Sequence, residues 1–514
     1  MKKISVYTAA LVALILFPSF IGAQSLTWNE TNAVRIEQND SAGSFSFSPQ
    51  IAISGNKAVS VWQQKGRNGM LRIYSNYTTI DGTGAIAWDT TKVDTVSNDD
   101  ADASEPQIAI SGDAAGDTVV AVWQQGSDIY SNYAIIDGVG AVTWNLDIAA
   151  PIEEVAGDAY YPQIAISGNT VVAVWVQYAN PAYYIYSTYT TDGGRNWHSA
   201  ERIDNSGGNA YYPQIAISGN TIVAIWIQYD WTNSPAYIYS NYATIDGGGV
   251  LTWNDTAVRI EDNNNNASDP PTPQIAILGG TEGDTVVAVW EQYDSNGKRL
   301  IYSNYAIIDG AGAVVWDTTK VDTVSSAVGY AYRVQIATSG NTAVAVWDQY
   351  VSGANTRIYS NYSTIDGAGA VIWDTTTVDT VSDDVTNAYN SQIAISGNNI
   401  VAVWRQSNES SHYNIYSNYT TMGGDGAVAW DETNAARIEN NIGWDTDNPQ
   451  IAISGDTAVA VWEQPATDNK DRVYSNYAVV APDSSANDNG SLPVGPLAAG
   501  ISALLVWRKR RKQA

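Results

Sequence analysis

Residues Gln163 to Gln177 read QIAISGNTVVAVWVQ, and this stretch decides the fold. The apolar residues up to Ser167 predict a strand, and Gly168-Asn169 is a strong hairpin turn signal. The following segment TVVAVWVQ predicts a second strand that is apolar on both faces. A strand with one wet face would alternate polar and apolar residues, so we expect this one to lie between two neighbouring sheets.

The same phrase returns along the chain, followed each time by Tyr-Ser-x-Tyr. Its opening glutamines are Gln50, Gln107, Gln163, Gln214, Gln274, Gln335, Gln392 and Gln450, at intervals of 51 to 61 residues. In the third copy we expect two further strands, at 184–190 and at 197–203. Four strands at this period are typical of one β-propeller blade. The sequence therefore predicts an all-β, eight-bladed propeller of four-stranded blades.

The count of strands supports a closed ring. The eighth copy supplies three strands and stops near Val480, without a Trp-led fourth strand. The segment from Leu26 to Glu37 closely matches the fourth-strand segment from Ala429 to Glu439. We therefore expect the N-terminal strand to complete the last blade and leave no unpaired ring edge. The alternative is an open β-solenoid.

The two ends of the chain indicate export. Residues 1–23 resemble a signal peptide, although a retained N-terminal membrane helix is the alternative. The propeller is expected at 24–481, followed by a polar spacer at 482–491. An apolar segment at 492–507 and a basic tail at 508–514 then resemble a membrane anchor or an exosortase-type sorting signal. The protein is therefore expected at the cell surface or outer envelope, tied to a membrane by its C-terminal segment or processed there.

Composition removes several classes of function. The chain has no Cys and a net charge of −28, so disulfides and Cys nucleophiles are excluded and nucleic acid is not an expected partner. His198 and His412 lie in different repeats without the spacing of a metal site. No metal or other cofactor is predicted.

The turn before the fourth strand carries a family resemblance. Residues 190–197 of the third copy read TTDGGRNW. This resembles the Asp-box of sialidase-like, BNR-repeat propellers, and six other copies carry looser versions. The resemblance implies a structural role in which Asp192 binds backbone amides of its own turn, Gly194 takes a positive φ and Trp197 packs beneath. Integrin-type propellers are a second possible relative, but their calcium loops are missing.

Catalytic sialidases use three arginines, a Tyr nucleophile with a Glu partner, and an Asp acid near the axis. By position in the repeat, Arg333 and Arg405 are the arginines expected near the centre, so the arginine clamp is predicted to be missing. We therefore expect a non-enzymatic propeller. A sialidase-like or other glycoside hydrolase with a rearranged site is the alternative, and a structural envelope component is a third.

Ligand binding is expected where the repeats differ. These are the connections between the second and third strands and those between blades, which lie on one face and are rich in aromatic residues. This face is predicted to bind a glycan or a protein, although any one tyrosine could simply cover the rim between blades. The candidate ligand-binding residues are Tyr161, Tyr178, Tyr212, Tyr229, Trp231, Tyr293, Tyr332, Arg333, Tyr350, Tyr389, Arg405 and Trp444.

Overall fold

Each repeat forms one antiparallel sheet in the computed structural model. The structure describes residues 25–481 except 29–32, 38–44, 67, 113–115, 146–148, 205–206, 230–235, 262–271, 280–283, 318, 320, 327, 351–352, 354, 367, 375–377, 384, 409–411 and 441–443. The described residues contain eight such sheets, which we number as blades 1 to 8 along the chain. This confirms the predicted all-β propeller with eight blades.

The strands follow the repeat from the axis outward. Blade 1 has β3 (Ser46–Ser54), β4 (Lys57–Lys65), β5 (Leu71–Thr79), η1 (Thr90–Lys92) and β6 (Asp94–Thr95). Blade 2 has β7 (Ala103–Ile110), β8 (Thr118–Gln125), β9 (Asp128–Ile136), β10 (Val142–Trp144) and β11 (Ala150–Pro151). Blade 3 has β12 (Ala159–Ser167), β13 (Thr170–Ala179), β14 (Ala182–Thr190) and β15 (Glu201–Arg202). Blade 4 has β16 (Ala210–Ser218), β17 (Thr221–Tyr229), β18 (Ala236–Ile245), β19 (Leu251–Trp253) and β20 (Val258–Arg259).

The second half repeats this order. Blade 5 has β21 (Gln274–Leu278), β22 (Thr285–Tyr293), β23 (Arg299–Ile308), β24 (Val314–Trp316) and β25 (Asp322–Thr323). Blade 6 has β26 (Tyr330–Ser339), β27 (Thr342–Tyr350), β28 (Thr356–Ile365), β29 (Val371–Trp373) and β30 (Asp379–Thr380). Blade 7 has β31 (Ala388–Ser396), β32 (Asn399–Ser407), β33 (Tyr413–Thr421), η2 (Glu432–Asn434) and β34 (Ala436–Arg437). Blade 8 has β35 (Asp447–Ser454), β36 (Thr457–Pro465) and β37 (Asp471–Val480), completed by β1 (Leu26–Trp28) and β2 (Val34–Arg35).

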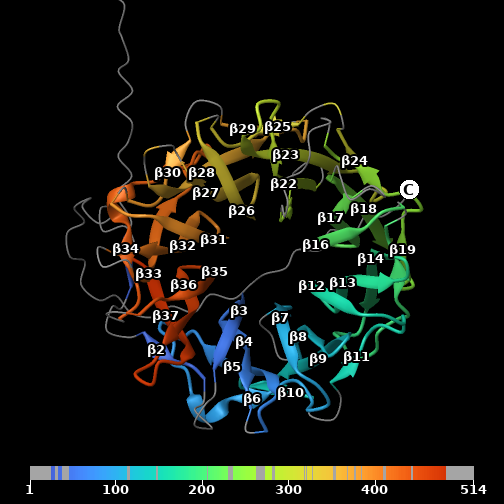
Figure 1. Cartoon of the computed structure of the whole chain (residues 1–514), viewed down its shortest axis with the longest axis horizontal. Helices are drawn as coiled ribbons and strands as arrows, with labels where there is room; N and C mark the ends of the chain where they lie inside the picture. Colours follow the sequence, from blue (N-terminus) through green and yellow to red (C-terminus); the bar gives the residue numbers. More distant parts are fainter. Residues whose placement is uncertain are drawn as a thin grey trace, which may run out of the picture. The chain divides into compact units, whose positions relative to one another are not determined.

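The ring is closed through blade 8 (Figure 1). β1 pairs with β37 so that Trp28 lies opposite Ala478, and β2 continues the pairing with Arg35 opposite Tyr474. Each innermost strand contacts the innermost strand of the next blade, including β35 against β3. The prediction that the N-terminal strand completes the last blade is confirmed.

The fourth strand differs from its predicted form. We expected one strand at 197–203 in blade 3, but only Glu201–Arg202 pairs there, with Tyr186 and Ser187 of β14. In blade 4 the fourth strand is split into β19 and β20, which both pair with β18. An intervening turn interrupts the ladder, so the outermost strand consists of short pieces that leave little exposed edge.

The hydrophobic core lies between successive blades. Val172 and Val174 of β13 pack in one cluster with Trp226 of the next blade. All residues of TVVAVWVQ except its first are buried, which confirms that this strand is covered on both faces. In each described blade the tryptophan Nε1 donates to the Oε1 of the glutamine two residues later, at 2.7 to 3.1 Å. This bond gives the N–H donor of a buried indole its acceptor, which explains why the Trp-x-Gln phrase recurs.

A buried asparagine joins neighbouring blades. In the Tyr-Ser-x-Tyr phrase, the x residue of seven described blades is an asparagine whose Nδ2 donates to a main-chain oxygen at the end of the preceding blade. At the ring closure, Asn76 Nδ2 donates to the main-chain oxygen of Ile36 at 2.9 Å. Blade 3 has Thr188 in this position instead. The N-terminal segment is therefore joined to blade 1 as well as to blade 8.

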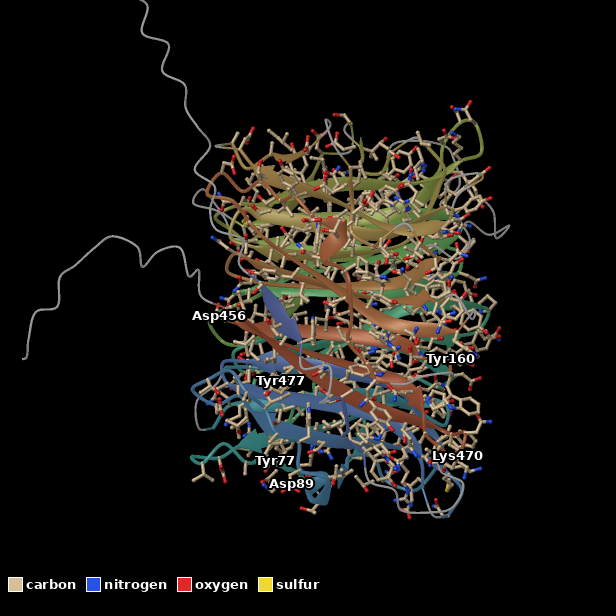
Figure 2. All side chains as sticks on the ribbon, turned by 90° about the vertical axis from the view of Figure 1, so that its left-hand side faces the viewer. Tyr77, Asp89, Tyr160, Asp456, Lys470 and Tyr477 are labelled. Carbon is tan, nitrogen blue, oxygen red and sulfur yellow. The ribbon has the colours of Figure 1, made fainter. Side chains whose placement is uncertain are left out.

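The two ends of each strand lie on opposite faces of the ring. Figure 2 shows Asp456, in the turn between β35 and β36, on one side and Tyr160 and Lys470 on the other. The face that carries Tyr160 therefore collects the connections between second and third strands and those between blades.

The predicted signal peptide, spacer, apolar segment and basic tail lie outside the described residues. Among the residues that are described, the structure has no helix of the length and apolarity that a membrane crossing requires.

Candidate functional site

A β-bulge marks where each innermost strand reaches this face. In β12 the register shifts between Tyr160 and Gln163, and Tyr161 has a φ of 54°. The residue two before the recurring glutamine has a positive φ in seven described blades, at Ser48, Glu105, Tyr161, Tyr212, Arg333, Asn390 and Asn448. Left-handed backbone is costly for residues other than glycine and is concentrated at functional sites. A bulge of this kind changes the direction of the side chain that it carries.

These bulge residues are where the repeats stop resembling one another. The glutamine that follows is the same in every blade, whereas the bulge position holds Ser, Glu, Tyr, Arg or Asn, and blade 5 has Thr272 there without a positive φ. Arg333, Asn390 and Asn448 all line one cavity at the mouth. A regular scaffold thus presents a ring of different side chains, which is the arrangement of a binding site.

Several bulges are held by the preceding blade. Glu463 Oε1 accepts the backbone N–H of Ser48 at 2.7 Å, and Asp348 Oδ2 accepts that of Asn390 at 3.1 Å. Glu291 accepts the backbone N–H of Arg333 in the same way. Each acceptor is the middle residue of a Trp-x-Gln phrase. Sequence reasoning missed these residues, although the variation of x between two fixed residues was a usable signal.

The cavity has a volume of about 410 Å³, and most of the residues that line it are of polar types, although their apolar atoms form much of its surface. Three of the recurring glutamines, Gln335, Gln392 and Gln450, contribute to its wall beside Arg299 and Arg333. This volume lies within the range of small-ligand sites, roughly 300–1,000 Å³.

The wall of this cavity continues into a network of charges that we call the polar arc. Its members are Glu291, Arg299, Arg333, Asp348, Asn390, Arg405, Asp447, Asn448 and Glu463. Arg299 Nη1 lies 3.2 Å from Glu291 Oε2, and Arg333 Nη1 lies 3.0 Å from Asp348 Oδ2. Arg405 pairs with Asp447 of the next blade. Each guanidinium in the arc therefore has its own carboxylate.

Burial changes the acidity of two carboxyls in the polar arc. It raises the pKa of Asp348 to about 6, although the Arg333 guanidinium opposes the shift. It also raises the pKa of Glu463, against hydrogen bonds from Asn448 and Ser48. Both carboxyls are thus harder to ionise than in water, because the fold removes them from solvent.

Blades 3 and 4 present a second group, the tyrosine arc. It consists of Tyr160, Tyr161, Tyr178, Tyr183, Tyr211, Tyr212 and Tyr229. Ring centroids lie 5.5 Å apart for Tyr161 and Tyr212, and 5.3 Å apart for Tyr183 and Tyr211. Burial, with the neighbouring phenols, raises the pKa of Tyr211 to about 12. The Tyr211 hydroxyl is therefore a hydrogen-bond donor that keeps its proton at neutral pH.

The structure places six of the twelve predicted binding residues in these two groups. Tyr161, Tyr178, Tyr212 and Tyr229 belong to the tyrosine arc, and Arg333 and Arg405 to the polar arc. Tyr293 and Tyr332 lie against Arg299, with ring centroids 5.3 and 4.8 Å from its guanidinium carbon.

Like Tyr293 and Tyr332, four further predicted residues are members of neither arc. The ring centroids of Tyr389 and Tyr413 lie 6.1 Å apart, and the Arg405 guanidinium lies over the Tyr413 ring. Tyr389 therefore borders the polar arc. Tyr350 is opposite Tyr330 at the end of β27, and Trp444 is partly exposed in the connection before β35. Trp231 lies outside the described residues.

One expectation about the arginines is wrong. From its place at the start of the third strand, Arg299 was expected away from the centre, but it lines the axial cavity. The Glu291 carboxylate and the Tyr293 hydroxyl, 3.2 Å from Arg299 Nη2, hold it there. Position within a repeat did not reveal the direction of a long side chain.

The Asp-box residues stabilise their turn. Asp192 Oδ1 accepts the backbone N–H groups of Arg195 and Asn196, each at 3.0 Å, and Gly194 has a φ of 87°. Trp197 packs against the core between blades 2 and 3. No cluster of three or more His, Asp or Glu among the described residues is arranged to hold a metal ion.

Comparison with known proteins yields fold-level similarity. No protein-family model matches the chain, and no curated protein matches its sequence. A protein of unknown function from Dyadobacter fermentans is 12% identical over 63% of this chain and 95% of that one, with a TM-score of 0.38. A Trypanosoma rangeli sialidase in complex with the inhibitor DANA is 11% identical over 66% of this chain, with a TM-score of 0.35.

A puromycin-hydrolyzing peptidase of Mycobacterium tuberculosis is 10% identical over 80% of this chain, with a TM-score of 0.40. The chain spans 56% of the sialidase and 57% of the peptidase. Similarity at this level carries no argument about activity, so the propeller assignment rests on the strand pairing itself.

Proposed function

We propose that the protein is a cell-surface β-propeller that binds a glycan, without chemical turnover, at the axial mouth formed by the polar and tyrosine arcs. The observation that supports this most is the ring of bulges, which places different side chains on an otherwise repeated scaffold. Exposed tyrosines suit the apolar faces of sugar rings, and amides and guanidinium groups suit their hydroxyls. Surface location rests on the export and tail signals of the sequence.

The acids at the mouth already have structural partners, which supports binding over catalysis. Asp348 Oδ2 accepts both Arg333 Nη1 and the backbone N–H of Asn390. Glu291 accepts the backbone N–H of Arg333 and pairs with Arg299. A general acid must direct its proton at the substrate, so carboxyls that hold the backbone in place are poor candidates.

A glycan array probed with the purified protein tests the proposal. Hits are then measured by calorimetry with Tyr212→Asn, because asparagine already occupies the bulge in blades 7 and 8 and keeps the backbone conformation. We expect at least about tenfold weaker binding, a loss of ~1.4 kcal/mol. Tyr350→Asn, outside both arcs, is the control. Equal affinities of Tyr212→Asn and the unaltered protein would remove the tyrosine arc from the site.

A glycoside hydrolase is the second candidate. The observation in its favour is that Glu291, Arg299, Tyr332 and Arg333 line one cavity, beside an Asp348 carboxyl with a pKa of about 6. Turnover of a fluorogenic glycoside panel that is lost in Arg333→Gln would favour the hydrolase. Binding without turnover supports the first proposal.

A further inference from the structure

We infer that the ligand of this mouth is a neutral, hydroxyl-rich glycan and that the site discriminates against acidic sugars. The inference rests on the proposed glycan binding and specifies its ligand class. It follows from three features: the balance of charges in the polar arc, the glutamines of the adjoining cavity wall, and the asparagine amides that carboxylates orient.

The charges of the polar arc leave no surplus of positive charge. Arg299, Arg333 and Arg405 each face a carboxylate, and Glu463 adds a fourth acid. An anionic ligand needs a cation that is not already neutralised, because its carboxylate loses water when it enters the cavity. The protein as a whole carries a net charge of −28, which repels anions at a distance. The charge balance of the polar arc and the net charge of the protein therefore both disfavour the binding of an acidic sugar.

The glutamines in the cavity wall match hydroxyl groups. Gln335, Gln392 and Gln450 line the cavity, and no hydrogen bond joins their side-chain amides to the described residues. An amide offers a donor and an acceptor, and a sugar hydroxyl does the same, so each can satisfy the other completely. A carboxylate only accepts, and it would leave the amide oxygens facing a negative charge.

The asparagine amides of the polar arc are oriented by carboxylates, each through one of the two N–H donors of the amide. Asn390 Nδ2 donates to Asp447 Oδ1 at 3.2 Å, and Asn448 Nδ2 donates to Glu463 Oε1 at 2.7 Å. A carboxylate partner fixes which end of each amide is the nitrogen. Each side chain keeps the second N–H of its Nδ2 and its carbonyl oxygen, and a sugar hydroxyl can bind both kinds of group, whereas a carboxylate can only accept.

Pairs of methyl glycosides that differ in one group test the inference. Methyl glucoside and methyl galactoside are compared with methyl glucuronide and methyl galacturonide by calorimetry on the full chain, beside a glycan array containing both classes. We expect the neutral member of a bound pair to bind at least about tenfold tighter, with little dependence on salt. Acidic sugars that bind as tightly as their neutral counterparts overturn the inference but leave glycan binding intact, whereas absence of any glycan hit overturns the proposed function itself.

Two substitutions that each remove one negative charge sharpen the test. Asp348→Asn leaves Arg333 without its carboxylate and is expected to bring the neutral-to-acidic affinity ratio down several-fold. Asp456→Asn makes the same change on the opposite face (Figure 2) and should leave the ratio unaltered. If Asp348→Asn does not fold, Arg333→Gln replaces it, because it removes a cation and must preserve the preference for neutral sugars. A ratio that moves equally in Asp348→Asn and Asp456→Asn contradicts the local mechanism.

Discussion

The tyrosine arc and the polar arc are built on the same bulge but held in different ways. In blades 3 and 4 the middle residue of Trp-x-Gln is Val176 or Ile227, both buried in the core. In blades 5 and 6 it is Glu291 or Asp348, which holds the backbone of the next blade. The x residues therefore add apolar packing under the tyrosine arc and charged hydrogen bonds under the polar arc, although the backbone N–H of Tyr161 is itself bound by the Glu105 carboxyl of blade 2.

The difference shows how a repeat protein can specialise without changing its fold. Two positions per blade, the bulge residue and the x residue, decide whether that sector of the mouth is aromatic or ionic. The strands, the Trp–Gln bond and the inter-blade asparagines are nearly constant around the ring. The polar arc depends on more buried carboxyls than the tyrosine arc does, and such carboxyls stay favourable only while their partners remain in place.

Opening the ring beside the polar arc should cause the largest loss of stability. Deletion of residues 26–37 removes β1 and β2, buried Ile36, and the pairing of Glu37 with buried Arg472 at 3.2 Å. We expect a loss of at least about 5 kcal/mol in unfolding free energy, measured by thermal and denaturant unfolding. Thr27→Ala, an exposed position in β1, is the matched control. An unchanged midpoint for the deletion would show that blade 8 does not need its fourth strand.

Substitution of the x residue should cost more stability under the polar arc than under the tyrosine arc. Asp348→Val puts the residue of blade 3 into blade 6 and leaves Arg333 Nη1 and the Asn390 N–H without their acceptor. The expected cost is about 3 kcal/mol, against about 1 kcal/mol for Ile227→Val under the tyrosine arc. Urea unfolding measures both. Similar costs would mean that the charged hydrogen bonds add nothing over packing.

Acid conditions should distinguish the arcs through Asp348. Its folded-state pKa of about 6 lies above the ordinary value, so the folded protein binds this proton more tightly than the unfolded chain does. The resulting stabilisation is complete below about pH 4 and is lost as the pH rises through about 6, a change of about 3 kcal/mol. Asp348→Asn should remove this part of the pH dependence in denaturant titrations from pH 4 to 7. Val176→Ala, under the tyrosine arc, should lower stability by the same amount at each pH, and a pH slope that is unaltered in Asp348→Asn would assign the titration to other groups.

Replacing a ring in the tyrosine arc should have the smallest effect on stability. Tyr161→Asn keeps a residue that tolerates positive φ and removes the contacts with Tyr160 and Tyr212. We expect a loss of about 1 kcal/mol, typical of an aromatic pair, by thermal unfolding. Tyr161→Val tests how much the backbone conformation contributes. A β-branched residue is strained at a φ of 54°, so this variant should lower stability further. If the valine variant were the more stable of the two, the bulge would not depend on the residue that occupies it.

Much of the candidate site could be predicted from sequence, and the reason is local. Tyr161 and Tyr212 stand next to fixed residues of the repeat, so their place at the mouth follows from the repeat itself. The location of Arg299 at the cavity could not be predicted from its position in the repeat. Its long side chain reaches from β23 toward the axis, where Glu291 of the neighbouring strand holds it. Glu291, Asp348 and Glu463 were missed because their partners lie in the next blade, or across the ring closure about 400 residues away for Ser48 and Glu463.

The sequence by itself determined the all-β class, the number of blades and the completion of blade 8 by the N-terminal strand. These follow from short-range periodicity and from matching copies of one repeat, which are visible in the order of residues. The tertiary structure decided which side chains meet at the mouth. The backbone of one blade is held by a carboxylate of another, and the guanidinium of Arg405 meets its carboxylate, Asp447, only because the next blade packs beside its own.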